Sequence, residues 1–245
     1  MAQVDNIYDK IQELLGVIPA NITILEQKVD SDIQNEYHNY AQSVSRQFNH
    51  DDILKKRNVV FEDDQTEEDR KDMIFKLSCI DHIDAYRTLE RCTDTMPGGL
   101  RDWAVLALQE NRLLLESRLL EQNSILISTG MGGKGLRLRY FTAFTSNNEF
   151  YSTFEKSLLI NEVNYAFARI RGEAESIRFD REICSVVGLI PLPVPVQKFI
   201  DEIIAECNLY GNFINPDYII TNVRVISNHE IRNLASLRKN KARKQ

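Results

Sequence analysis

The chain has 245 residues, of which 43% are hydrophobic and 27% charged, and its net charge is −6. This length suits two domains of about 120 residues, each large enough to bury its own core. No apolar run approaches the roughly 20 residues of a membrane-spanning helix, and the N-terminus lacks a basic segment before an apolar core. We therefore expect a cytoplasmic globular protein without a membrane span or a secretory signal.

The cysteines and histidines are scattered rather than grouped. Cys79, Cys92, Cys184 and Cys207 form no C-x-x-C pair, and they lie in apolar segments or near a helix end. This pattern favours reduced, buried thiols over disulfides or zinc ligands. No two histidines have the i, i+4 spacing of a helical metal site, so we predict neither a metal nor a cofactor.

Charge is divided unevenly along the chain. Residues 1–123 carry 24 acidic and 14 basic side chains, whereas residues 124–245 carry 12 acidic and 16 basic ones. An acidic helical half joined to a basic mixed half is a physical asymmetry that bears on the choice of partners.

The first half, residues 1–123, has apolar side chains at helical spacing and predicts an all-α domain. Helices are expected at residues 5–15, from Asn21 or Thr23 to about 40, at 69–93, and at 100–122. Residues 49–70 are rich in charge and predict a polar linker, anchored by Phe61 in the apolar group Val59–Phe61. Whether that group forms a strand stays open. Trp103 is expected in the core rather than in a ligand site.

Residues 82–120 have the form helix, proline-containing turn, helix, and the second helix opens with Leu-Arg-Asp-Trp-Ala. This segment resembles a HEAT-type helical repeat. In that family an aspartate early in the second helix helps to fix the turn, and Asp102 occupies the matching position. The resemblance implies stacked helix pairs and protein binding rather than catalysis. Residues 49–70 depart from the regular period of such an array.

The second half, residues 124–245, changes to a period of two. It predicts a two-layer α+β sandwich, with an antiparallel sheet, helices on one face and the order ββαββα-β. In chain order these elements are expected at 125–127, 136–144, 150–171, 173–179, 183–190, 196–208 and 218–226. Asn147 or Asn148 is expected to cap the first helix, with Phe154 on its apolar side.

The loop between the first two of these strands reads TGMGGKG and suggests a phosphate cradle. A P-loop needs a helix directly after the loop and a Ser or Thr beside the lysine. Here Gly135 follows Lys134, and the residues after it alternate as a strand does. The loop therefore predicts a hairpin tip. Any ligand there would be an anion or an RNA backbone held by Lys134, Arg137 and Arg139.

One face of the predicted strand 136–144 carries Arg137, Arg139 and Phe141. This face could bind RNA through phosphate pairing and base stacking, could dock against the acidic helical domain, or could face water. The sequence leaves these three alternatives open.

The chain ends in a short predicted helix, with Asn228 as its cap, and a basic tail. The tail cations are Arg238, Lys239, Lys241, Arg243 and Lys244. They form either a solvated terminus or a nucleic-acid-binding arm, and the affinity of such an arm would depend strongly on salt.

No catalytic motif is apparent: the sequence has no G-x-S-x-G, no dinucleotide fingerprint and no cysteine–histidine frame. We therefore expect a non-enzymatic adaptor that binds a protein partner, self-association included. One alternative is an RNA- or ribosome-associated factor that uses the hairpin face and the tail. Another is an enzyme or a ligand sensor with a pocket between the two domains.

Overall fold

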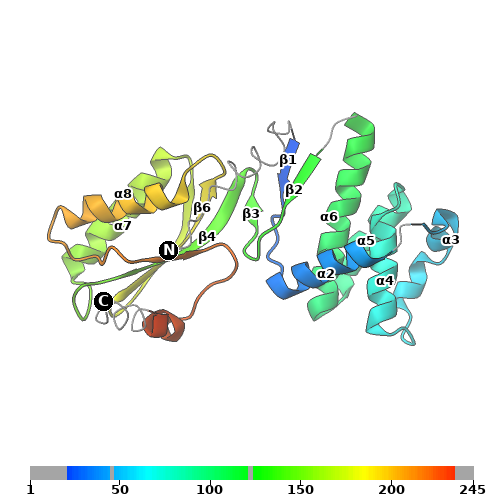
Figure 1. The fold of residues 1–245 in the computed structure, drawn as a ribbon, viewed down its shortest axis with the longest axis horizontal. Helices are drawn as coiled ribbons and strands as arrows, with labels where there is room; N and C mark the ends of the chain where they lie inside the picture. Colours follow the sequence, from blue (N-terminus) through cyan, green and yellow to red (C-terminus); the bar gives the residue numbers. More distant parts are fainter. Residues whose placement is uncertain (1–20, 45–46, 121–123, 235–245) are drawn as a thin grey trace. The chain divides into compact units, whose positions relative to one another are not determined.

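The computed structural model describes residues 21–44, 47–120 and 124–234, which form a mixed α+β structure with an antiparallel sheet (Figure 1). The contacts divide the described residues into a helical unit within Pro19–Gly132 and an α+β unit within Gly133–Gln245. The predicted helix at residues 5–15 and the five cations of the basic tail lie outside the described residues.

The helical unit is built from five α-helices and one 3₁₀ helix among its described residues. They are α2 (Ser31–Ser43), α3 (His50–Lys55), η1 (Arg57–Phe61), α4 (Glu67–Ser78), α5 (Ile83–Thr95) and α6 (Gly98–Leu120). Asp30, Asn49, Thr66 and His82 each accept a backbone N–H at the start of a helix. These side chains satisfy donors that a helix leaves unpaired at its first turn.

The predicted polar linker at residues 49–70 is wrong, because this segment folds into α3, η1 and the start of α4. Asn49 and Thr66 act as N-caps, and Val60 is fully buried. Most of its charges lie on short helices, and Glu62, Asp63 and Asp64 lie in the turn between η1 and α4. Phe61 is an anchor as predicted, since it packs against the core and lies 4.0 Å from the Arg91 guanidinium. The single helix predicted at residues 69–93 is likewise two helices, α4 and α5.

Trp103 is at the centre of the helical core, as the sequence predicts. It is fully buried, and its ring meets Tyr37 and Tyr40 of α2 at centroid distances of 4.9 and 5.5 Å, edge to face. Its indole N–H donates to the carbonyl of Lys71 at 3.0 Å. Asn111 of α6 is also buried, and its amide donates to three carbonyls at the end of α4. These contacts tie α2, α4 and α6 into one core.

The helical unit also contains a two-stranded parallel sheet. Strand β1 (Asn21–Ile24) pairs with β2 (Ser124–Ile127), and the N–H of Leu25 continues the ladder to the carbonyl of Ile127 at 2.9 Å. The helix predicted to start at Asn21 or Thr23 therefore begins only at Ser31. Similarly, the strand predicted at residues 125–127 belongs to the helical unit and not to the hairpin of the second domain.

The α+β unit runs in the order β3 (Gly133–Lys134), β4 (Arg137–Thr145), α7 (Thr153–Arg169), β5 (Glu173–Asp180), β6 (Ile183–Pro191), α8 (Val196–Asn208) and β7 (Ile219–Thr221). Its antiparallel sheet has the order β3-β4-β6-β5, and β7 also pairs with β4. The last strand is shorter than the predicted 218–226. The cap of α7 is Ser152, which forms a capping box with Glu155, and not Asn147 or Asn148.

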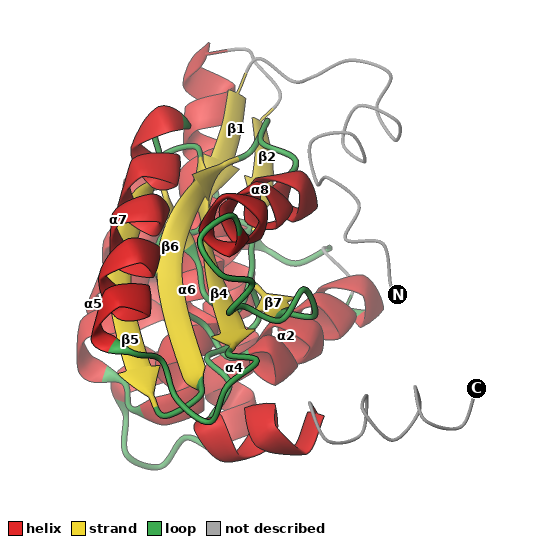
Figure 2. Cartoon of the chain, turned by 90° about the vertical axis from the view of Figure 1, so that its left-hand side faces the viewer, coloured by secondary structure: helices red, strands yellow, loops and turns green. Residues whose placement is uncertain are grey.

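Helices α7 and α8 lie on one face of this sheet (Figure 2). The ring of Phe167 from α7 lies directly above Gly188 of β6, where a side chain would collide with it. Phe199 of α8 meets the same ring edge to face at 5.1 Å. The absence of a side chain at Gly188 therefore lets α7 approach the sheet closely.

None of the four cysteines is in a disulfide, and Cys92, Cys184 and Cys207 are buried, whereas Cys79 is half-buried. The predicted burial is therefore confirmed for three of the four thiols. Of the helices in the described part of the chain, none is sufficiently long and apolar to cross a membrane.

Candidate functional site

In the glycine-rich loop, Gly132 and Gly135 have positive φ angles, and Gly132 lies close to another backbone segment. Gly132 has φ +65°, and a Cβ atom there would lie 2.6 Å from the carbonyl oxygen of Glu26. Gly135 has φ +58° and follows Lys134, the last residue of β3, so it occupies the first position of the two-residue turn into β4. A strand, β4, follows the loop as predicted. The close approach of residues 26–27 thus explains Gly132, and the turn explains Gly135.

The predicted cations of the hairpin lie beside carboxylates of β5. Arg139 forms a bidentate ion pair with Glu175, with N···O distances of 2.5 and 2.7 Å. Arg137 and Lys134 lie 3.7 and 4.0 Å from the carboxylate of Glu173. The structure thus brings the three predicted cations together, but two glutamates offset most of their charge. A face that binds a phosphate backbone needs uncompensated positive charge, and this one has little.

Phe141 cannot stack on a base in this structure, because it is only 1% exposed. The strand register confirms that Phe141 shares a face with Arg137 and Arg139, since their partners in β6 are Val187, Pro191 and Leu189. The expectation of an accessible aromatic ring beside the arginines is wrong, because Phe141 is part of the core.

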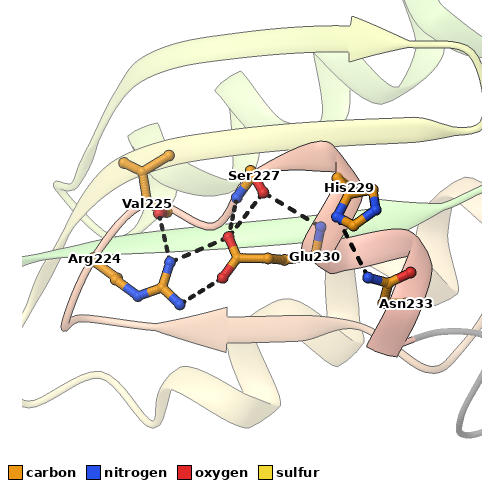
Figure 3. A network of polar contacts seen from close by, with 6 residues as sticks. All are labelled: Arg224, Val225, Ser227, His229, Glu230 and Asn233. Atoms are coloured by element: carbon orange, nitrogen blue, oxygen red, sulfur yellow. Dashed lines mark hydrogen bonds and ion pairs between the residues drawn. The ribbon is translucent and has the colours of Figure 1, made fainter.

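The described C-terminal segment is held by a capping box (Figure 3). Residues 228–234 are helical, and Ser227 and Glu230 exchange hydrogen bonds at 3.0 and 3.3 Å. Arg224 donates a hydrogen bond to the same carboxylate, and its guanidinium lowers the pKa of Glu230 to about 2. The cap is therefore Ser227 rather than the predicted Asn228, whose amide instead donates to Asp180 at 2.8 Å. The tail cations Arg238, Lys239, Lys241, Arg243 and Lys244 lie beyond the described residues.

Four large apolar side chains are exposed where α7 begins and α8 ends. They are Phe150, Phe154, Leu209 and Tyr210, which are between 62% and 75% exposed and which we call the apolar patch. The sequence pattern did not reveal this patch, and Phe154 was expected on the buried side of its helix. Successive residues of a helix turn by about 100°, so Phe154 lies roughly opposite the buried Val163 on α7, and the predicted grouping of these two residues on one side is wrong.

The two segments that carry the apolar patch are bonded to one another. The backbone N–H of Asn147 donates to the carbonyl of Phe213, and its side-chain amide donates to the carbonyl of Asn212, both at 2.8 Å. Taken together, the two segments, residues 147–156 and 205–212, contain three glutamates and one lysine. One backbone hydrogen bond and one side-chain hydrogen bond therefore join the two segments, which together carry more acidic than basic side chains.

The helical unit contains a cavity of about 350 Å³. Its lining residues are Gln34, Asn35, Tyr37, His38, Leu106, Glu110, Leu126 and Ser128. They come from α2, α6 and the end of β2, and all belong to the helical unit. Burial and the nearby Glu110 carboxylate raise the pKa of Tyr37 well above its usual value, so its hydroxyl remains a donor.

The chain matches no protein-family model, and no curated protein matches it either. Its function is therefore inferred from the side chains of the two units alone.

Proposed function

We propose that the protein is a non-enzymatic cytoplasmic adaptor that binds a partner protein through the apolar patch. The observation that carries this proposal is the exposure of four large apolar side chains on two bonded segments. Exposed apolar groups are common singly, but clustered ones with a polar rim mark interaction surfaces. Aromatic residues in particular contribute much of the binding free energy at protein interfaces. The free thiols are in keeping with a reducing compartment.

The partner is expected to present an apolar segment flanked by lysine or arginine. Glu149, Glu155 and Glu206 stand in the segments that form the patch, opposed there by Lys156 alone. An acidic rim steers basic partners toward the patch and disfavours acidic ones. The apolar side chains then contribute most of the affinity once water is excluded.

The finer architecture is part of the same proposal. The helical unit is proposed to stack its helix pairs in a HEAT-like manner, on the basis of α5 and α6 joined at Met96–Pro97. Asp102 accepts the backbone N–H of Asp30 at 3.2 Å, so it links α6 to the start of α2. The α+β unit is proposed to be a two-layer sandwich, on the basis of α7 and α8 on one sheet face. RNA binding through the hairpin is not favoured, because Glu173 and Glu175 offset most of the charge of its three cations.

The test compares partner capture by the wild type and by a Phe150→Ser/Phe154→Ser variant. Both side chains are exposed, so the fold should survive, and thermal unfolding checks this. Ile83→Ser is the matched control, because Ile83 is an exposed apolar residue of the helical unit. A protein recovered by the wild type and the control should be lost from the variant, and its purified form should bind the variant about tenfold or more weakly.

Two results would contradict the proposal. Equal binding of the purified partner by the wild type and the variant would show that the patch is not the interface. A dimer that sedimentation detects in the wild type, and that the double substitution dissociates, would instead identify the occupant as a second copy of the chain.

A further inference from the structure

The cavity of the helical unit contains a carboxylate without a basic partner. Glu110 of α6 is half-buried at its wall, and no lysine, arginine or histidine of the described residues forms an ion pair with it. Other acids of the helical unit, such as Glu116 and Asp72, do have basic partners at i, i+4. A partly desolvated carboxylate is costly unless a positive charge or several donors compensate for it.

Neutral hydroxyl groups fix one oxygen of this carboxylate. Tyr37 donates to Oε2 of Glu110 at 2.7 Å, and the hydroxyl oxygen of Ser78 lies 3.3 Å from the same atom. The ring of Tyr37 is itself held between Phe75 and Trp103. The carboxylate is therefore held in place through Oε2, and no described residue donates a hydrogen bond to its other oxygen, Oε1.

The remaining walls suit a short carbon chain with a polar head. Leu106 and Leu126 supply apolar surface. Gln34 is locked, because its amide donates to the carbonyl of Val29 at 3.0 Å and accepts from the hydroxyl of Ser128 at 2.8 Å. His38 is exposed and bonds to Gln42 at 2.7 Å. The polar lining thus contains both donors and acceptors, and Glu110 is its one carboxylate, in a cavity that has the volume of a small-molecule site.

We propose that this cavity binds an organic ammonium ion. The ammonium group pairs with Glu110, and the carbon chain of the ligand lies against Leu106 and Leu126. An anion of the same size would be repelled by the carboxylate, and a neutral alcohol would leave its charge uncompensated. The site belongs to the helical unit and is independent of the apolar patch, so either proposal can fail alone.

The experiment uses 1,4-diaminobutane as the probe, with 1,4-butanediol and succinate as neutral and anionic comparators of similar length. Nuclear magnetic resonance would follow the methyl groups of Leu106 and Leu126 in the full chain, and calorimetry would give the affinities. We expect the diamine alone to shift these signals at concentrations up to about 10 mM, a range suited to a ligand of so few atoms.

Glu110→Gln is the decisive variant, because its amide oxygen still accepts the Tyr37 hydroxyl and only the charge is lost. It should weaken diamine binding about tenfold or more. Glu116→Gln is the matched control on the same helix: Glu116 pairs with Arg112 at 2.9 Å, does not line the cavity, and should leave binding unchanged. Unfolding midpoints of both variants would exclude a general loss of structure.

The proposal would be overturned if the diamine and the diol bound equally, or if the wild type and Glu110→Gln bound the diamine equally. The absence of any shift of the methyl signals with the diamine would also overturn it. A capped lysine, N-acetyl-lysine methylamide, separates the two sources of an ammonium group. Tighter binding of this probe than of the diamine would support the site and assign its ligand to a lysine side chain. Weaker binding would support the site and assign its ligand to a free amine.

Discussion

Gly188 offers a direct test of how closely α7 packs on the sheet. It pairs with Tyr140 in β4, and a Cβ atom at this position would lie 2.5 Å from both Cε1 and Cζ of Phe167. Carbon atoms pack best at about 3.5–4.0 Å, so Gly188→Ala forces the ring to move by about 1 Å. Such overpacking typically costs about 1–3 kcal/mol, and the reduced entropy of the unfolded chain offsets about 0.4–1 kcal/mol of it. We expect a net loss of about 1–2 kcal/mol.

Urea unfolding measures this loss, and a double-mutant cycle tests its cause. Phe167→Leu removes the ring atoms that the new methyl group would meet, at the cost of the ring contact with Phe199. In that background Gly188→Ala should cost about 1 kcal/mol less than in the wild type. A Gly188→Ala protein as stable as the wild type would refute the close approach. An identical penalty in both backgrounds would show that Phe167 is not its cause.

Two further predictions concern single hydrogen-bonding groups. Asn111→Ala should destabilise the helical unit by about 2–4 kcal/mol in denaturant unfolding, because the carbonyls of Leu77, Ser78 and Ile80 lose a buried donor. A loss of stability under about 0.5 kcal/mol would contradict this role. The Arg224 guanidinium lowers the pKa of Glu230 from 4.5 to about 2, so the contribution of this carboxylate is complete above about pH 4.5 and is lost as pH falls through 2. The Glu230 carboxyl resonance should titrate near 2 and move upward in Arg224→Gln, whereas a wild-type midpoint near 4.5 would exclude the pairing.

The elements that the sequence predicted well depend on local patterns. Helix α8 has the predicted bounds, and strands β5 and β6 differ from their predicted bounds by one residue at one end. Their alternation or helical period is complete within the segment, and turn residues separate them clearly. Trp103 was predictable for the same reason, since a large apolar residue early in an apolar helix is usually buried.

The errors concern features that depend on distant residues. Strand β1 is a strand because it pairs with β2, about a hundred residues later, and nothing within Asn21–Ile24 reveals that partner. The glutamates that neutralise Arg137 and Arg139 lie two strands away, across β6. The cavity was equally hidden, because Tyr37 and Glu110 come from different helices and meet only in the fold.

Both proposed surfaces select positively charged ligands, and this agrees with the electrostatics of the whole chain. The cavity presents the carboxylate of Glu110, and the apolar patch has an excess of glutamate at its rim. With a net charge of −6, long-range attraction favours basic partners and opposes nucleic acid, unless a local cluster of cations is exposed. In the described residues the cluster at the hairpin is paired with Glu173 and Glu175. Within the described part of the chain, the two surfaces proposed for binding are therefore apolar or acidic.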